Sequence, residues 1–256
     1  MKDFIIDLRS DTITIPTPEM LDYMFSAKVG DDVWEEDETV KGLENNLASL
    51  FSKEAALFCP SGTMANQIAI RVHTKIGDEV ICDRLSHIYN YEGGGIASNS
   101  SVSVRLLDGD YGRITVDQIQ QNINPDDIHF ARTSLVCLEN TVNKGGGVCY
   151  DYSQMQAISR YCKSNKLALH LDGARVFNAL IAKKDSSQSY GALFDSVSVC
   201  LSKGLGAPIG SVLIGESNFI KQAKRVRKSF GGGMRQVGYL AAAGQYALKN
   251  HIHRLA

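Results

Sequence analysis

Two side chains with complementary chemistry follow neighbouring apolar segments of this chain. Lys203 comes after the segment Ser196–Leu201, and Asp172 directly follows the segment Lys166–Leu171. A lysine amine held against apolar surface can attack a carbonyl carbon and form a Schiff base. The position in the sequence alone does not distinguish such a lysine from a solvated lysine in a turn. The aspartate can keep a ring nitrogen protonated or can cap the following helix. Together the pair indicates a site for pyridoxal phosphate (PLP), in which the lysine holds the aldehyde and the acid keeps the pyridine ring an electron sink.

A second group of residues could bind the anionic parts of such a cofactor or of its substrate. Ser61, Gly62 and Thr63 follow a short apolar segment and open a helix, where backbone N–H groups and hydroxyls can hold a phosphate. The alternative is that Ser61 is an ordinary helix cap. Arg175 lies three residues after Asp172 and could reach the ring hydroxyl or a substrate carboxylate, or could form only a surface salt bridge.

Histidines in several segments are further candidates. His87 precedes the glycine run Gly93–Gly95 and could stack on a planar cofactor or could be structural. His129 is interpreted on its own as structural. His251 and His253 have no acidic or thiol side chain nearby in the sequence, so we interpret them as surface residues and not as metal ligands.

Basic side chains surround a glycine run near the end of the chain. The glycines are Gly231–Gly233, and the cations are Arg225, Arg227, Lys228 and Arg235. The cations can bind an anion, and the glycines allow the backbone to approach it closely. A nucleic-acid surface is disfavoured because the formal net charge is -1 and no aromatic residues are interleaved with the cations.

The elements that must position these residues are short strands that alternate with helices. The predicted strands span residues 55–58, 79–82, 102–106, 134–139, 166–171, 196–201 and 211–214. The predicted helices span residues 39–52, 62–74, 115–122, 152–164, 174–183, 216–229 and 235–253, and another begins near Thr17. This alternation predicts an α/β fold with a mostly parallel sheet flanked by helices. Ligands of such sheets bind beyond the carboxyl ends of the strands, which is where Asp172 and Lys203 are expected.

The overall composition is that of an ordinary globular protein. The 256 residues are 44% apolar and 21% charged, which suits one large domain. The absence of a run of 18 apolar residues predicts no membrane span, and the acids within residues 1–7 argue against a secretory signal. The cysteines, 6 in all, lack metal-site spacing and are typical of reduced thiols, so we expect a cytoplasmic protein.

From about Ile6 to its end the chain resembles the low-specificity L-threonine aldolases, PLP enzymes of fold type I, the aspartate aminotransferase fold. The resemblance rests on eight ordered segments: Asp7–Thr12, Gly30–Val33, Pro60–Asn66, His87–Glu92, Leu138–Thr141, His170–Arg175, Leu201–Leu205 and Gly231–Gln236. It implies that residues 1–256 form the PLP-binding large domain of a PLP-dependent transferase-like protein.

The resemblance also implies roles around the cofactor. Lys203 would form the Schiff base with PLP, Asp172 would bind the pyridine nitrogen, and His87 would stack on the ring. Gly62 and Thr63 would hold the phosphate. The site would therefore lie where the strands preceding these residues end.

Other implied roles concern the substrate and the assembly. Arg235 and Lys228 would reach the cofactor, in this family often from a neighbouring subunit of a dimer or tetramer. Ser10 and Arg175 would bind the carboxylate of a small amino-acid substrate, and His129 would be the second active-site histidine. No metal ion is assigned to the site.

The reaction that the resemblance implies is retro-aldol cleavage of L-threonine or L-allo-threonine to glycine and acetaldehyde. His87 or His129 would take the β-hydroxyl proton. Another fold type I lyase acting on β-substituted amino acids would use the same Lys203 and Asp172. A nucleotide-binding α/β protein is disfavoured because a glycine fingerprint after the first strand and a P-loop are both missing.

The resemblance departs from the family pattern at the end of the chain. Family members continue into a small C-terminal domain that supplies another carboxylate-binding arginine, whereas this sequence ends at Ala256, in the last predicted helix. We therefore expect the small domain to be missing and apolar surface to be exposed where it would pack. An inactive, truncated PLP-binding chain is the alternative that this departure leaves open.

Overall fold

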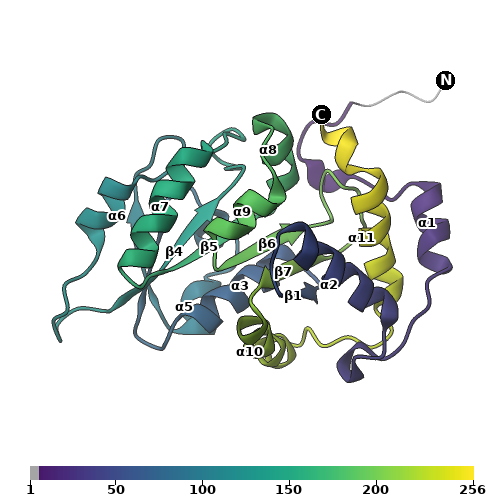
Figure 1. Cartoon of the computed structure of the whole chain (residues 1–256), viewed down its shortest axis with the longest axis horizontal. Coiled ribbons are helices and arrows are strands. Elements are labelled where there is room, and N and C mark those ends of the chain that lie inside the picture. Colours follow the sequence, from purple (N-terminus) through teal and green to yellow (C-terminus); the bar gives the residue numbers. More distant parts are fainter. Residues whose placement is uncertain (1–5) are drawn as a thin grey trace.

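A seven-stranded sheet crosses the molecule, and the computed structural model describes its chain over residues 6–256 (Figure 1). The strands are β1 (Ala55–Cys59), β2 (Glu79–Asp83), β3 (Ser103–Leu107), β4 (Thr133–Glu139), β5 (Ala168–Gly173), β6 (Ser196–Cys200) and β7 (Ser211–Gly215). Their order is β1-β7-β6-β5-β4-β2-β3. Strand β7 runs antiparallel to both of its neighbours, and the other neighbouring strands are parallel. The predicted mostly parallel sheet is confirmed.

Helices connect the strands and cover the sheet. They are α1 (Pro18–Phe25), α2 (Glu38–Leu50), α3 (Gly62–His73), α4 (His87–Asn90), α5 (Gly95–Ser100), α6 (Val116–Asn122), α7 (Tyr152–Ser164), α8 (Val176–Lys183), α9 (Ser187–Leu193), α10 (Ser217–Ser229) and α11 (Gly238–Asn250). Short 3-10 helices are η1 (Asp11–Ile13), η2 (Asp32–Trp34) and η3 (Ile252–Leu255). Helix α1 begins as predicted, with the Thr17 side chain accepting the Met20 N–H and Pro18 in the first turn.

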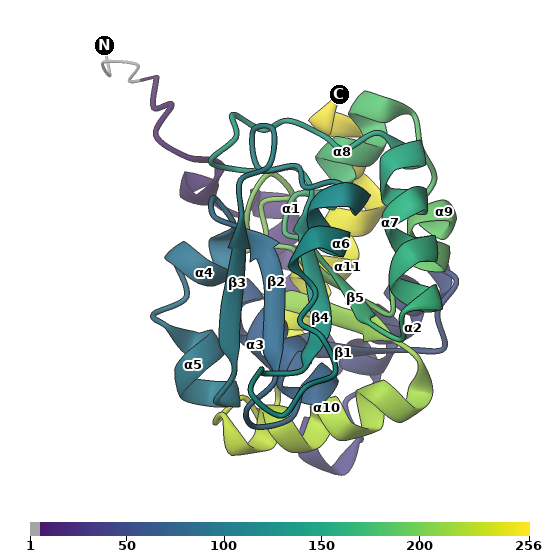
Figure 2. The same cartoon turned by 90° about the vertical axis from the view of Figure 1, so that its left-hand side faces the viewer.

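The helices lie on both faces of the sheet, as the alternating pattern predicts. Figure 2 shows α3, α4 and α5 on one side of the sheet and α6 and α7 on the other. Alternate residues of β1 illustrate the two cores: Leu57 packs in the cluster with α3 and α10, whereas Phe58 packs in the cluster with α2. Because the strands other than the edge strand β3 are covered on both faces, nearly all of their residues are buried whichever way they point.

Several element boundaries differ from the prediction. Strand β5 extends through Asp172, so this residue is the penultimate one of the strand and not the first one after it. The helix predicted over 235–253 begins only at Gly238, whose N–H is accepted by the Asp37 carboxylate, and ends at Asn250. Helices α4, α5 and α9 are short, and no hydrophobic period marks them in the sequence; α5 and α9 are also rich in glycine and serine.

Large apolar side chains are exposed along α1 and along the N-terminal arm, which is the segment of residues 6–17. Leu8 is 91% exposed, Ile15 is 81% exposed, and Phe25 at the end of α1 is 79% exposed. Helix α1 lies beside α11, and the arm lies at the side of the molecule that also carries the C-terminus (Figure 1). No helix within residues 6–256 is long and apolar enough to cross a membrane. Residues 1–5, on which part of the argument against a secretory signal rests, lie outside the described residues.

Candidate active site

Two acidic side chains lie next to each other at the carboxyl edge of the sheet. Glu139 ends β4 and is paired in register with Asp172 of β5. The side chains are 5% and 3% exposed. One Asp172 oxygen accepts the Ala174 N–H at 3.1 Å, and the other accepts an amide hydrogen of Asn66 at 2.9 Å. The predicted cofactor acid is therefore buried and held in one orientation.

Lys203 lies at the same edge, in the loop after β6. Its Nζ is 3.6 Å from the Cys200 thiol, and it forms no ion pair within residues 6–256. The loop is held from outside, because Thr14 of the N-terminal arm donates to the Lys203 carbonyl oxygen at 2.7 Å. A ring nitrogen of His251 lies 2.7 Å from the Leu205 carbonyl oxygen. The interpretation of His251 as a surface residue is wrong. The end of α11 packs on the loop after β6, and this contact buries the His251 side chain.

The N-terminus of α3 faces the end of β6. Ser61 caps the helix, accepting the Met64 N–H at 3.1 Å, so the predicted cap and the predicted phosphate-binding turn are the same turn. The N–H groups of Gly62 and Thr63 have no acceptor within the helix because they belong to its first turn. A Cβ on Gly62 would lie 2.6 Å from the Cys200 sulfur, so glycine lets the helix N-terminus approach the strand that carries Lys203.

His87 is the first residue of α4 and faces the acidic pair. Its Nδ1 is 3.0 Å from Glu92, and its backbone N–H donates to Glu139 at 2.8 Å. The hydrogen bond with Glu92 raises the pKa of His87 against the effect of burial. With Nδ1 engaged, Nε2 is the ring nitrogen left to exchange a proton.

Glu92 and Asn66 belong to the site, although the sequence analysis assigns them no role. Glu92 accepts hydrogen bonds from Asn66 at 2.9 Å and from Gln67 at 2.6 Å. Burial raises the pKa of Glu92, and its hydrogen bonds oppose that shift. Both residues lie inside segments that carry the resemblance, but only their contacts across the fold reveal what they do.

One set of side chains could in principle hold a metal ion. His87, Glu92 and Asp172 each offer a donor atom, and these atoms lie within 4.8 Å of one another. The Asn66 amide donates to both carboxylates, and the imidazole contacts one of them. Hydrogen bonding therefore accounts for the geometry of the cluster.

Glu139 is the most perturbed acid of this edge. Burial and the neighbouring Asp172 carboxylate raise its pKa to about 7, although it accepts the N–H groups of His87 and Asn143. The latter bond, at 2.9 Å, ties the loop after β4 to the site. Glu139 therefore orders two backbone segments beside the Asp172 carboxylate.

Arg175 is paired with a carboxylate of the N-terminal arm. Its Nε and Nη2 donate to Asp11 at 2.8 and 2.7 Å. The pKa of Asp11 is lowered, as the Arg175 hydrogen bond and the charges of Arg175 and Lys203 outweigh burial. Ser10 is adjacent and caps η1 by accepting the Thr12 N–H. The two predicted carboxylate-binding residues thus lie together near Lys203.

His129 is not brought to this cluster. It precedes β4, whereas the site lies where β4 ends, and a strand of seven residues spans roughly 20 Å. Its ring contacts Asp127 at 2.7 Å, and its side chain is 80% exposed. Within one chain, His87 is therefore the predicted histidine that reaches the site.

The remaining cations lie around the glycine run. Arg235 donates to Asp31 at 2.9 Å, and Lys228 is exposed. A Cβ on Gly232 would lie 2.3 Å from the Met64 sulfur, so the run packs closely against the first turn of α3. Within residues 6–256, no hydrogen bond or ion pair joins Lys228 or Arg235 to Lys203, Asp172 or His87.

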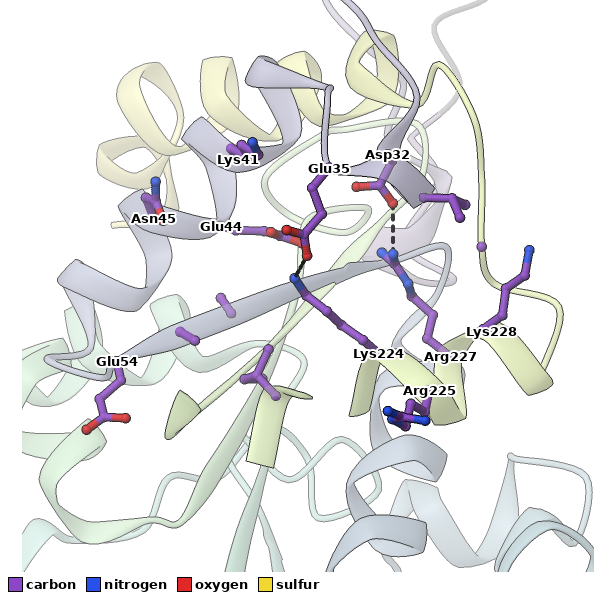
Figure 3. A pocket seen from close by; sticks show the side chains of 15 residues that line it. Asp32, Glu35, Lys41, Glu44, Asn45, Glu54, Lys224, Arg225, Arg227 and Lys228 are labelled. Atoms are coloured by element: carbon purple, nitrogen blue, oxygen red, sulfur yellow. Dashed lines mark hydrogen bonds and ion pairs between the residues drawn. The ribbon is translucent and has the colours of Figure 1, made fainter. Parts of the chain in front are cut away.

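A cleft of about 610 Å³ lies beside this run, between α2, β1 and α10 (Figure 3). Arg227 crosses it and donates to Asp32 at 2.8 Å and to the Phe58 carbonyl oxygen at 2.7 Å. Glu44 accepts the Phe58 N–H at 2.8 Å from the opposite wall. The cleft contains Lys228 but none of the residues at the carboxyl edge of the sheet.

Comparisons with known proteins place this arrangement in a family. Residues 7–256 match the model of the beta-eliminating lyases. The chain is 46% identical to the low specificity L-threonine aldolase of Escherichia coli K12, covering 98% of this chain and 75% of that protein. It is 43% identical to low-specificity L-threonine aldolase 1 of Arabidopsis thaliana, covering 98% and 71%.

The fold agrees with a solved structure. The Leishmania major threonine aldolase superimposes with a TM-score of 0.85 at 24% identity, covering 95% of this chain and 72% of that one. The predicted fold class is therefore confirmed. With a family match over residues 7–256 and close relatives over nearly its whole length, this chain belongs to the beta-eliminating lyase family, among relatives named low-specificity L-threonine aldolases.

Proposed function

We propose that this chain is a PLP-dependent aldehyde-lyase that cleaves L-threonine or L-allo-threonine to glycine and acetaldehyde. The observation that carries the proposal is the meeting of Lys203, Asp172 and the N-terminus of α3 at one edge of the sheet. The names of the relatives support the substrate class.

The side chains present fit PLP. Lys203 offers an amine without an ion-pair partner among the described residues, and Asp172 offers a buried acid for the pyridine nitrogen. Ser61, Gly62 and Thr63 offer hydroxyls and the N–H groups of a helix N-terminus, which suit a phosphate. When bound, PLP would supply a sink for the electron pair released as the Cα–Cβ bond breaks.

The remaining residues would orient the substrate and move its proton. Arg175 presents the planar fork that binds a carboxylate, and Ser10 lies beside it. His87 would accept the β-hydroxyl proton at Nε2, because Nδ1 is engaged with Glu92. Clamping the carboxylate would turn the Cα–Cβ bond into the orientation in which it breaks.

We further propose a homo-oligomer, dimer or tetramer, in which Lys228 and Arg235 serve a neighbouring site. Their separation from Lys203 within one chain supports this role, as do the apolar side chains exposed along the N-terminal arm. A cytoplasmic location is proposed from the cysteines: all 6 are free, and 5 of them are buried.

The test is acetaldehyde release from L-threonine and L-allo-threonine by the 256-residue chain supplied with PLP, beside Lys203→Ala. We expect release by the wild type and a loss of at least about 1,000-fold in the variant. Products other than glycine and acetaldehyde would point to a different lyase of this family. PLP binding without turnover of either amino acid would show that the chain is not an aldolase.

A further inference from the structure

A stripe of buried polar side chains lies under α3, where an apolar core is the ordinary expectation. The residues of β5 and β6 that face away from α3 are apolar and belong to the main core, among them Leu171 and Val197. The alternate residues His170, Ser196 and Ser198 are polar and 0% exposed. Burying such groups is costly unless each is hydrogen-bonded, so their arrangement calls for an explanation.

Asn66 of α3 is the centre of this stripe. Its two amide hydrogens point to Asp172 and Glu92, both at 2.9 Å. Its carbonyl oxygen accepts the Ser198 hydroxyl at 2.6 Å and lies 3.1 Å from Nε2 of His170. Because the amide hydrogens are committed to carboxylates, the oxygen must accept from His170, which fixes a hydrogen on Nε2.

The same reasoning extends to the far end of the stripe. With hydrogen on Nε2, Nδ1 of His170 is an acceptor, and it lies 2.8 Å from the Ser196 hydroxyl. That hydroxyl is also 2.8 Å from Nε2 of His73, the last residue of α3, which must then donate to it. Burial lowers the pKa of His170 to about 3 and that of His73 to about 4, so both rings are neutral and have one tautomer each.

We propose that Asn66, His170 and Ser196 are positioning residues for Asp172, forming with His73 a hydrogen-bond chain in which every hydrogen points toward the Asp172 and Glu92 carboxylates. The proposal rests on the function proposed above, in which Asp172 binds the pyridine nitrogen of PLP. The hydrogen-bond chain fixes the amide orientation of Asn66. Asn66 in turn holds two carboxylates, that of Asp172, which would meet the cofactor, and that of Glu92, which orients His87.

Ser196 is important because the hydrogen bonds all run in one direction, toward the carboxylates. His170 and Asn66 lie between Ser196 and Asp172 in this series of hydrogen bonds. Ser196→Ala removes the only hydroxyl that lies against Nδ1 of His170 among the described residues. Nδ1 of His170 then has no donor to hold the ring, and the N–H of His73 loses its acceptor as well. The His170 ring can then tilt and weaken its Nε2–H bond to the Asn66 oxygen, which lets Asn66 rotate and withdraw its hydrogens from the carboxylates.

The first experiment needs no cofactor. Long-range proton–nitrogen NMR spectra of the imidazoles distinguish the two tautomers in the apo chain. We expect His170 and His73 to be neutral Nε2–H tautomers that do not titrate between about pH 5.5 and about pH 8. An Nδ1–H tautomer of His170, or a titration of either histidine in this range, would contradict the proposed chain of hydrogen bonds.

The second experiment measures the PLP dissociation constant and the thermal stability of variants. Ser187→Ala is the matched control, because Ser187 on α9 is also buried and donates to the Leu50 carbonyl oxygen at 2.7 Å. We expect Ser196→Ala to weaken PLP binding roughly tenfold, whereas Ser187→Ala changes stability alone. Equal PLP affinity in the two variants would overturn the positioning role.

A pair of substitutions at His170 separates hydrogen bonding from packing. His170→Gln retains an N–H donor for Asn66, whereas His170→Leu does not. We expect the Gln variant to bind PLP within about threefold of wild type and the Leu variant more than tenfold more weakly. Equal losses in both would contradict the proposal. If the wild-type protein binds no PLP, both the proposed function and the role of these residues toward the cofactor are overturned. The NMR result would still decide whether the hydrogen bonds run as proposed.

Discussion

At the scale of single residues, the His87–Glu92 pair controls the proton that the proposed reaction moves. Glu92 raises the pKa of His87, and the base must be neutral to accept a proton, so activity is lost as the pH falls through that pKa. Glu92→Gln removes the charge and lowers the pKa of His87. We expect the acidic limb of the kcat/KM profile to move to lower pH and kcat to fall about tenfold or more, because the ring also loses its orientation.

Glu92→Asp is the control for this prediction. It keeps a carboxylate within the same hydrogen-bonded group of His87, Asn66 and Gln67, so its acidic limb is expected to lie between those of wild type and Glu92→Gln. If the limb does not move in Glu92→Gln, then His87 is not the group that titrates in the reaction.

Single residues also show what the sequence could reveal. Lys203, Asp172 and His87 are recognisable because each lies at or after the end of a strand and has a reactive side chain. Asn66 and Glu92 carry no such signal: an asparagine inside a helix is ordinary, and its partners are up to 132 positions away in the sequence. Their roles follow from contacts between strands and a helix that no local pattern encodes.

At the scale of elements, the half-buried carboxyl group of Glu44 on α2 holds the edge strand β1 to that helix. Burial raises the pKa of Glu44 from 4.5 to about 7 while it accepts the Phe58 N–H. The folded chain therefore keeps this proton up to about pH 7, whereas the unfolded chain releases it near 4.5. Stability falls as the pH rises between these values, by up to about 3 kcal/mol, and stays lower above pH 7.

Glu44→Gln tests this linkage. The amide oxygen can accept the same N–H without a charge, so we expect the variant to melt on the order of 5 °C higher than wild type at about pH 8 and at a similar temperature at about pH 4.5. Calorimetry of both proteins at the two pH values is the measurement. A difference of the same size at both pH values would mean that packing, not ionisation, separates them.

Element boundaries were predictable where a hydrophobic period is continuous. Helix α7 (Tyr152–Ser164) coincides with the predicted range. Helices α4 and α5 lie in a segment rich in glycine and serine, and tertiary contacts with α3 stabilise them. The strands of the active edge are nearly all apolar in sequence, but in β5 and β6 one face is polar because α3 supplies the matching groups.

At the scale of the whole molecule, we expect an interface between subunits around Trp34. This is the single tryptophan of the chain, it is 73% exposed, and it lies in η2 beside the segment that pairs with Arg235. Exposed aromatic side chains next to cations are typical anchors of interfaces. Trp34→Glu should therefore shift the sedimentation of the chain toward the monomer and lower the activity that depends on a shared site.

Ile76→Glu is the matched control. Ile76 is equally exposed at 73%, but it lies in the turn between α3 and β2, at the opposite edge of the sheet from the proposed site. Its variant is expected to keep the oligomeric state of wild type. If both substitutions leave sedimentation unchanged, the surface around Trp34 is not part of the interface.

The position of His129 shows why the whole molecule resists prediction from sequence. The resemblance assigns this residue to the active site, yet its loop lies at the far end of β4 within one chain. Sequence motifs record which residues occur together but not which chain supplies them. The pattern of residues alone therefore does not reveal how the subunits are arranged.

The burial of the thiols has a practical consequence for labelling chemistry. Burial raises the pKa of Cys59, Cys82 and Cys162 to about 12, and Cys137 and Cys200 are buried as well. Cys149 is only partly buried, so a thiol reagent near neutral pH should modify one equivalent in the folded chain and 6 after unfolding in urea. Cys149 follows the loop whose Asn143 is hydrogen-bonded to Glu139, so a fluorophore attached there would report on ligand binding without any engineered cysteine.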